Sequence, residues 1–165
     1  MESLNTIGTW WMWAGFFAII LVMLAADLLL DAFCFGVGVD RAVFAMLQSR
    51  GEGKVLIGQL GRGDITPDQL KKFQVAFSRT TPNLVQKSLT MCKDIALAPD
   101  KVDTLPDALQ FLVQNRTVYL FPVCLKEKGI ALLYLDRSQE KPRLASDQVQ
   151  QVRRFRDFAQ QREFG

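Results

Sequence analysis

The sequence predicts an α+β fold in which a mostly antiparallel sheet is flanked by helices and preceded by one N-terminal transmembrane helix. Three observations support this prediction. No charged residue occurs from Ile7 to Ala26. Two pairs of apolar segments are joined by short glycine-containing turns, as in β-hairpins. The last segment, residues 146–162, repeats apolar side chains at spacings of three and four, which indicates an amphipathic helix.

The length of 165 residues predicts two parts, a membrane segment at residues 1–30 and one folded domain at residues 31–165. The second part is long enough to bury a single hydrophobic core. The net charge is +3, and no dense basic patch is interleaved with aromatic side chains. Nucleic acid is therefore not an expected partner.

The cysteine and histidine content limits the chemistry. The three cysteines, Cys34, Cys92 and Cys124, are widely spaced and form no paired motif. This pattern argues against a disulfide framework and a zinc site, so we expect three buried thiols in a reducing compartment. Histidine is absent, which excludes Ser-His-Asp and Cys-His catalytic sets. We expect no metal site, no cofactor and no enzymatic activity.

The apolar run from Ile7 to Ala26 is long enough for a membrane helix, because a helix of this length spans roughly 30 Å. A signal peptide would require a basic residue before the apolar run, and this sequence has none there. Trp10, Trp11 and Trp13 cluster at one end, as in an interfacial aromatic belt. Lys and Arg occur only after the run, so the inner (cytoplasmic) membrane is the expected location, with the domain facing the cytoplasm.

Two acidic residues, Asp27 and Asp31, follow the apolar run and would share one face of a continuing helix. One interpretation is that they mark the boundary of the lipid headgroups. The other is that they belong to a cation pathway, since an acid inside a membrane is costly and often functional. A single helix supplies no partners for such a pathway.

The first 28 residues resemble the first helix of the TerC family, integral membrane proteins linked to tellurium resistance and metal export. The resemblance lies in Ile7-Gly8-Thr9, the tryptophan-rich entry and Leu24-Ala25-Ala26-Asp27-Leu28. It implies membrane insertion. The alternative function is accordingly a truncated TerC-family protein with a soluble regulatory part, although the further membrane helices of that family do not occur in this chain.

The elements expected after the membrane helix follow from local patterns. Residues 28–36 continue or end a helix that Gly36 and Gly38 break. Residues 40–48 and 54–60 form a hairpin, and Thr66 with Pro67 begins a short helix. A strand at residues 74–78, a helix at 82–93 and a short helix at 107–113 follow.

A second hairpin joins residues 117–125 to residues 130–136, and its strands are apolar on both sides, which places it in the centre of the sheet. Pro122 predicts a sheet edge or a bulge in the first of these strands. The final helix, residues 146–162, has an apolar stripe of Val149, Val152, Phe155 (or Phe158) and Ala159. The first and last helices should share one face of the sheet.

Residues 28–162 resemble the GAF-like domain found C-terminal to HDOD domains in bacterial signalling proteins. The matching pieces are the segment 36–47, Pro82-Asn83-Leu84, Phe121-Pro122-Val123 and the segment 128–137, which ends in Tyr134-x-Asp136. No HDOD domain precedes them here, and the membrane helix joins near residues 27–31. The resemblance implies a sensory, regulatory or dimerisation module without catalysis, whose candidate partners are a second copy and an unidentified small molecule.

Such a domain would hold a ligand between the sheet and its helices. Five aromatic residues are candidates for lining that pocket, with plain core packing as the alternative: Phe44, Phe73, Tyr119, Phe121 and Tyr134. Two adjacent charged pairs, Asp40 with Arg41 and Asp136 with Arg137, are expected to be structural ion pairs at strand ends. The alternative for Asp40 and Arg41 is an ion pair beside the ligand cavity.

Overall fold

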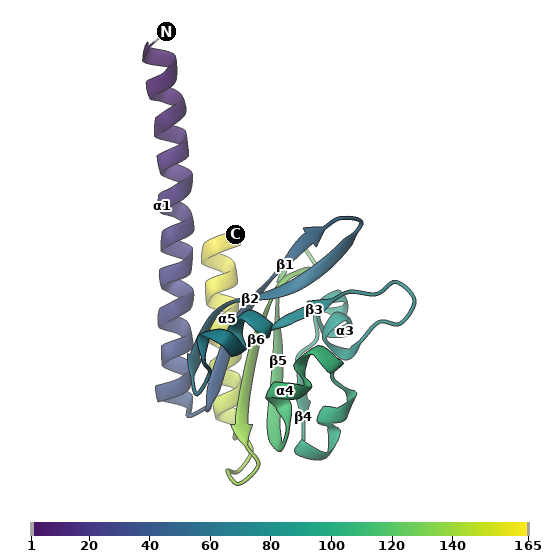
Figure 1. Cartoon of the computed structure of the whole chain (residues 1–165). Helices are drawn as coiled ribbons and strands as arrows, with labels where there is room; N and C mark the ends of the chain where they lie inside the picture. The colour runs from purple at the N-terminus through teal and green to yellow at the C-terminus, as the bar shows by residue number, and fades with distance from the viewer. Residues whose placement is uncertain (1, 165) are drawn as a thin grey trace.

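The computed structural model describes residues 2–164, with side chains described from residue 10 to 157 except at position 22. A six-stranded sheet forms its centre, in the order β3-β2-β1-β6-β5-β4, and every neighbouring pair is antiparallel (Figure 1). The strands are β1 (Arg41–Arg50), β2 (Gly53–Gly63), β3 (Gln74–Ala76), β4 (Ile95–Leu97), β5 (Arg116–Leu125) and β6 (Lys128–Ser138). The sheet confirms the predicted antiparallel α+β architecture.

Both predicted hairpins are present. β1 pairs with β2, and β5 pairs with β6. The β5–β6 hairpin lies inside the sheet, as its apolar character predicted. Pro122 pairs with Leu132 beyond the last residue that β4 pairs, and the register shifts between Val123 and Cys124. On the side of β5 that faces away from β6, Pro122 therefore has no strand partner and lies beside a bulge, so its missing N–H is tolerated.

Helical segments connect and cover the strands. They are α1 (Glu2–Ala32), η1 (Phe33–Val37), α2 (Pro67–Lys72), α3 (Leu84–Met91), η2 (Pro99–Thr104), η3 (Asp107–Leu109), α4 (Gln110–Val113) and α5 (Ser146–Phe164). The Thr66 side chain caps α2 by accepting from the backbone N–H of Gln69 at 3.1 Å, as the Thr-Pro pattern predicted. Gly38, with φ of 85°, ends the turn after α1. β4 and η2 were not predicted.

One face of the sheet is covered by α2, α3 and the short helices up to α4 (Figure 1). Its core includes Phe73, Leu89, Leu112, Leu120 and Tyr134, all of which are fully buried. Burial of large apolar side chains of this kind is the dominant stabilising contribution to a fold. No α1 residue whose side chain the structure describes belongs to this layer.

The opposite face is covered by the C-terminal part of α1 and by α5, which lie side by side (Figure 1). Leu30 and Phe33 pack there with Val152 of α5, and the rings of Phe33 and Phe155 lie 6.0 Å apart. The prediction that the first and last helices share a face is confirmed. Phe158 and Ala159 of the predicted stripe lie outside the described side chains.

The N-terminal part of α1 runs past the sheet (Figure 1). Its large apolar side chains are exposed: Trp10, Trp11, Met12, Trp13, Phe16, Phe17, Ile19, Ile20 and Leu21. Among the described residues, the segment Trp10–Val37 is, by its length and composition, the one helix long and apolar enough to cross a membrane.

Candidate functional site

The five aromatic candidates are divided between the two faces of the sheet. Tyr119 pairs with Leu135 and Leu120 pairs with Tyr134, so Tyr119 and Tyr134 point to opposite faces. Tyr134 packs against Phe73 with ring centroids 5.5 Å apart, under the α2–α4 layer. Phe44, Tyr119 and Phe121 pack in the other layer, with α1 and α5. The five residues therefore do not line one common pocket.

The aromatic residues under α5 are held in place individually. The rings of Tyr119 and Phe121 are nearly parallel, with centroids 6.4 Å apart. The hydroxyl of Tyr119 accepts a hydrogen bond of 2.9 Å from the backbone N–H of Leu144, just before α5. This bond fixes the entry of the chain into its last helix.

The predicted charged residues are paired across strands and not with their neighbours in sequence. Asp136 and Arg137 are adjacent in β6 and point to opposite faces, while Asp40, just before β1, contacts Lys141 and the backbone N–H of Ser138. Instead Arg41 of β1 and Asp136 of β6 are register partners and form a salt bridge of 2.8 Å. Arg137 donates to the carbonyl oxygens of Gly38 at 3.0 Å and Pro142 at 2.9 Å.

Asp136 is completely buried and accepts hydrogen bonds from three side chains. The Nε of Arg41 lies 2.9 Å and 3.1 Å from its two oxygens, the hydroxyl of Tyr134 lies at 2.6 Å and the Nη1 of Arg116 at 3.2 Å. Arg41 also donates to the carbonyl oxygen of Leu112 in α4. Burial raises the pKa of the Asp136 carboxyl, and hydrogen bonding from Arg41 acts against that rise.

The outer part of the cluster is Asp40, which accepts from the backbone N–H of Ser138 at 2.7 Å and pairs with Lys141. Burial acts to raise the pKa of Asp40, but the bonds from Lys141 and Ser138 outweigh it and hold the pKa below its usual value. Among the described residues, no side-chain atom of this cluster is buried without a partner. The cluster therefore fixes the strand ends, and its buried side-chain atoms are all used within the fold.

Asp27 and Asp31 share a face of α1, as predicted, and both bind Arg62 of β2; the Nε of Arg62 lies 3.0 Å from Asp31 Oδ1. Arg62 belongs to the Gly61-Arg-Gly-Asp64 segment. The pair thus joins the end of the apolar helix to the edge of the domain. Each carboxylate has a cationic partner, which supports the boundary interpretation over a cation pathway.

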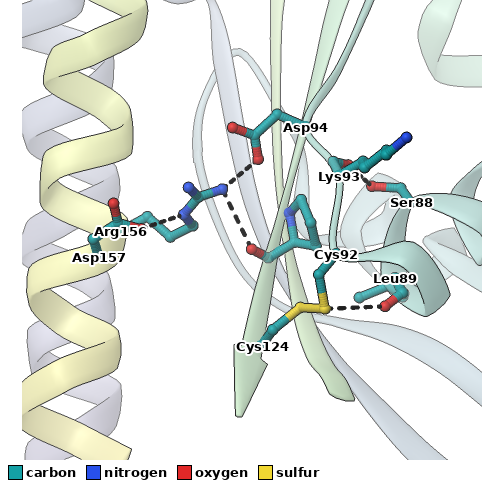
Figure 2. The surroundings of a disulfide bond; sticks show 9 residues. Ser88, Leu89, Cys92, Lys93, Asp94, Cys124, Arg156 and Asp157 are labelled. Carbon is teal, nitrogen blue, oxygen red and sulfur yellow. Dashed lines mark hydrogen bonds and ion pairs between the residues drawn. A yellow bond between two sulfur atoms is a disulfide. The ribbon is translucent and has the colours of Figure 1, made fainter. Parts of the chain in front are cut away.

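The expectation of three free thiols is wrong. Cys92, which caps the C-terminus of α3, forms a disulfide with Cys124 of β5 (Figure 2). Only Cys34 is a free cysteine among the described residues. The two cysteines are 32 residues apart in sequence, so no local sequence motif predicts the disulfide. The odd cysteine count reflects one bonded pair and one thiol.

The disulfide lies at an open depression of about 530 Å³ lined by Thr90, Met91, Cys92, Cys124, Lys126 and Glu127. Cys92 is half-buried, whereas the exposed fraction of Cys124 is 9%. The depression is formed by the last turn of α3 and by the turn between β5 and β6. None of its residues was predicted as a functional site from the sequence.

Comparison with solved structures identifies the fold. The GAF domain/HD domain protein from Geobacter sulfurreducens matches with a TM-score of 0.71 and 15% identity, over 86% of this chain and 91% of that chain. The fold is GAF-like. The GAF domain of a two-component sensor histidine kinase from Bacillus halodurans matches with a TM-score of 0.61 and 12% identity, over 84% of this chain and 92% of that chain.

A fragment of a methyl-accepting chemotaxis protein, residues 122 to 287, has the same fold, with a TM-score of 0.60 and 16% identity over 85% of this chain and 87% of that chain. No protein-family model matches the sequence, and no curated protein matches it. The comparisons show neither the TerC resemblance nor an association with HDOD domains. The TerC alternative is therefore not supported.

Proposed function

We propose that this protein is a non-catalytic sensory or regulatory module of GAF-like fold, tethered to a membrane by α1. The observation that carries the proposal is the division of α1 into two parts. Leu30 packs in the domain core with an exposed fraction of 1%, whereas Trp13 and Leu21 have exposed fractions of 54% and 65%. An apolar surface of this extent is unfavourable in water and is typical of an interaction site.

A bilayer fits this surface. The exposed apolar residues surround the helix, as the lipid-facing surface of a single spanning helix requires, and the tryptophans gather toward its N-terminal end. Arg62 binds both acidic residues where the apolar run ends, so the charges that follow the run are paired at the junction with the domain. The preference of Lys and Arg for the cytoplasmic side of a membrane supports a cytoplasmic position for the domain.

The sensory role rests on the kind of protein that shares the fold. The sensor histidine kinase and the chemotaxis protein compared above are named as signalling proteins. The sequence contains no histidine, so a Ser-His-Asp or Cys-His catalytic set cannot form from its residues. Because the five aromatic candidates face different layers, the proposal does not depend on a ligand pocket that they form together.

Membrane extraction tests the tether. Phe17→Arg combined with Leu21→Arg places two charges in the apolar run at sites exposed in the protein, and each arginine costs about 3 kcal/mol at the centre of a membrane helix. The unchanged protein should resist extraction by alkaline carbonate, and the double variant should move to the soluble fraction. Phe111→Arg, at an exposed apolar site on α4, is the matched control and should stay in the membrane.

Protease protection tests the orientation. In inverted membrane vesicles the domain should be digested, and in intact cells it should be protected. Recovery of the unchanged protein in the soluble fraction would refute the tether. Digestion in intact cells would instead place the domain on the outer side.

A further inference from the structure

The disulfide Cys92–Cys124 conflicts with a domain that faces the cytoplasm, and this conflict is informative. Reducing compartments keep thiols reduced, and the disulfides found there are usually transient, either catalytic or redox-sensing. The inference below rests on the proposed function, because it takes the domain to be a regulatory module in the cytoplasm. It adds the signal that such a module would detect.

The disulfide can be reached from solvent on one side. Cys92 is half-buried, and both sulfur-bearing residues line the open depression of about 530 Å³. An attacking thiolate would meet Cys92 first, since Cys124 lies deeper in β5. Lys126 and Glu127 line the same depression, so its rim carries one charge of each sign.

The disulfide joins the same two segments that Arg156 of α5 bridges (Figure 2). Asp94 lies two residues after Cys92, and Pro122 lies two residues before Cys124. Arg156 forms an ion pair with Asp94, and its Nη1 lies 3.5 Å from the carbonyl oxygen of Pro122. The covalent bond and the arginine therefore hold one pair of chain segments together.

A second arginine of α5 strengthens this contact, because the Nε of Arg153 lies 2.8 Å from Asp94 Oδ2. The guanidinium of Arg156 also lies 6.0 Å from the ring centroid of Phe121. We call the set Asp94, Pro122, Arg153 and Arg156 the α5 clamp. α5 packs through Phe155 on Phe33 of η1, the segment that directly follows α1, so a change in the clamp would reach the end of the membrane helix through η1.

Breaking the disulfide removes a covalent restraint on the backbone at Cys92. The φ angle of Cys92 is 51°, in the left-handed region that residues other than glycine rarely adopt. The Sγ of Cys92 lies 3.7 Å from the carbonyl oxygen of Leu89, which could accept from a thiol S–H after reduction. Without the disulfide, the segment from Cys92 to Asp94 is held by the hydrogen bonds between Ser88 and Lys93 and by the α5 clamp.

We propose that Cys92–Cys124 is a reversible thiol–disulfide site whose reductant is a dithiol, and that its redox state sets how firmly the α5 clamp holds α5. The thiolate of the dithiol attacks the Sγ of Cys92 and forms a mixed disulfide, while Cys124 leaves with the bonding electron pair and takes up a proton. The second thiol of the reductant then attacks its own mixed sulfur and releases Cys92. Two electrons and two protons pass to the domain, and the dithiol becomes a disulfide.

The first measurement is thiol titration of the full chain in mild detergent, without denaturant. Treatment with dithiothreitol or with a thioredoxin-type protein should expose two new thiols that alkylation and mass spectrometry assign to Cys92 and Cys124. Reduction by either reagent supports a reversible thiol–disulfide site. Comparing the two reagents shows whether a small dithiol or a dithiol protein reduces the bond more readily. A disulfide that is reduced only after unfolding would be a structural bond and would overturn the proposal.

The second measurement is hydrogen exchange of the α5 amides between residues 146 and 157. Reduction should accelerate their exchange by about tenfold, as expected for a coupling of moderate size. The Cys92→Ser/Cys124→Ser variant should show the fast rate with and without reductant. Cys34→Ser, at the free cysteine, should respond to reductant as the unchanged protein does.

Two matched variants test whether faster exchange of α5 results from the α5 clamp or from a general loss of stability. Asp94→Asn removes the carboxylate that both arginines bind, so α5 should exchange fast in the oxidised protein and gain nothing on reduction. Asp157→Asn removes an exposed carboxylate that Arg156 also binds, but within α5 itself, and should keep the full redox response. Unchanged α5 exchange on reduction, or an equal loss of response in both variants, would refute the coupling.

These outcomes are independent of the tether. Carbonate extraction of the Cys92→Ser/Cys124→Ser variant should match that of the unchanged protein, because the membrane helix is intact. If the protein is soluble, the proposed tether fails while the exchange data still decide the redox site. If the protein is membrane-bound and its α5 exchange ignores reductant, only the redox proposal fails.

Discussion

The two ends of the β5–β6 hairpin are held in different ways. At its open end, Asp136 is fully buried, and every partner comes from a side chain fixed in the sheet. At its closed end, Cys124 is bonded to a helix terminus beside an open depression, and α5 is held by arginines that are partly exposed. The first arrangement can only be lost by damage to the fold, whereas the second can be opened by a reagent from solvent.

The largest effect is expected at the open end. Asp136→Ala leaves Arg41 buried without its partner, and breaking a buried ion pair in this way costs about 4 kcal/mol of unfolding free energy. Urea unfolding of the full chain in mild detergent measures the loss. Glu140→Ala, at an exposed acidic residue in the following loop, should be neutral.

A double variant sharpens this result. Arg41→Met combined with Asp136→Leu removes both charges and should recover part of the loss, because no buried charge remains unpaired. A double variant as unstable as Asp136→Ala would show that Tyr134 and Arg116, which also bind Asp136, carry the cluster.

The closed end should contribute less. For residues 32 apart, the chain-entropy description gives a stabilisation of about 3.7 kcal/mol. Disulfides typically contribute about 2–4 kcal/mol, at or below that value, so Cys92→Ala/Cys124→Ala should lose about 3 kcal/mol. The unchanged protein in reductant should unfold at the same urea concentration as the variant in either buffer. A loss that persists only in the variant would indicate a packing defect and not the loss of the cross-link.

A smaller effect is expected where the hairpin meets α3. A Cβ added at Gly129 would lie 2.4 Å from the carbonyl oxygen of Leu89, in the last turn of α3. Gly129→Ala should therefore cost about 2 kcal/mol, as overpacking does. Thermal unfolding compares it with Gly36→Ala, which has no atom within 4 Å of the new Cβ and should leave stability unchanged.

The sequence predicted the elements better than it predicted their contacts. Hairpins, the Thr66 cap and the bulge beside Pro122 depend on residues near one another in sequence, so local patterns reveal them. β4 was missed because it is only three residues long and is separated from its partner β5 by the helical segments of residues 99–113. The short helix η2 beside it was missed in the same mixed segment.

The site residues were harder to predict because they depend on register. The salt bridge between Arg41 and Asp136 exists because these residues are paired across β1 and β6, which no local pattern specifies. Alternation within β5 could have placed Tyr119 and Phe121 on one face, but the register with β6 was needed to place Tyr134 on the other. Cys92 and Cys124 likewise meet only through the tertiary fold.

The smallest predicted effect concerns Asp40, at the solvent-facing part of the open end. Its pKa is held below the usual value by Lys141 and the Ser138 N–H, so its carboxylate stabilises the fold above about pH 3.8 and stops doing so as pH falls through the lowered pKa. Asp40→Asn should cost less than about 1 kcal/mol at pH 7, as exposed pairs do. Because the asparagine does not titrate, the stability difference from the unchanged protein should shrink toward pH 2. Urea unfolding from pH 7 to pH 2 measures this convergence, and a difference that stays constant across the range would show that Asp40 acts through its backbone geometry and not through its charge.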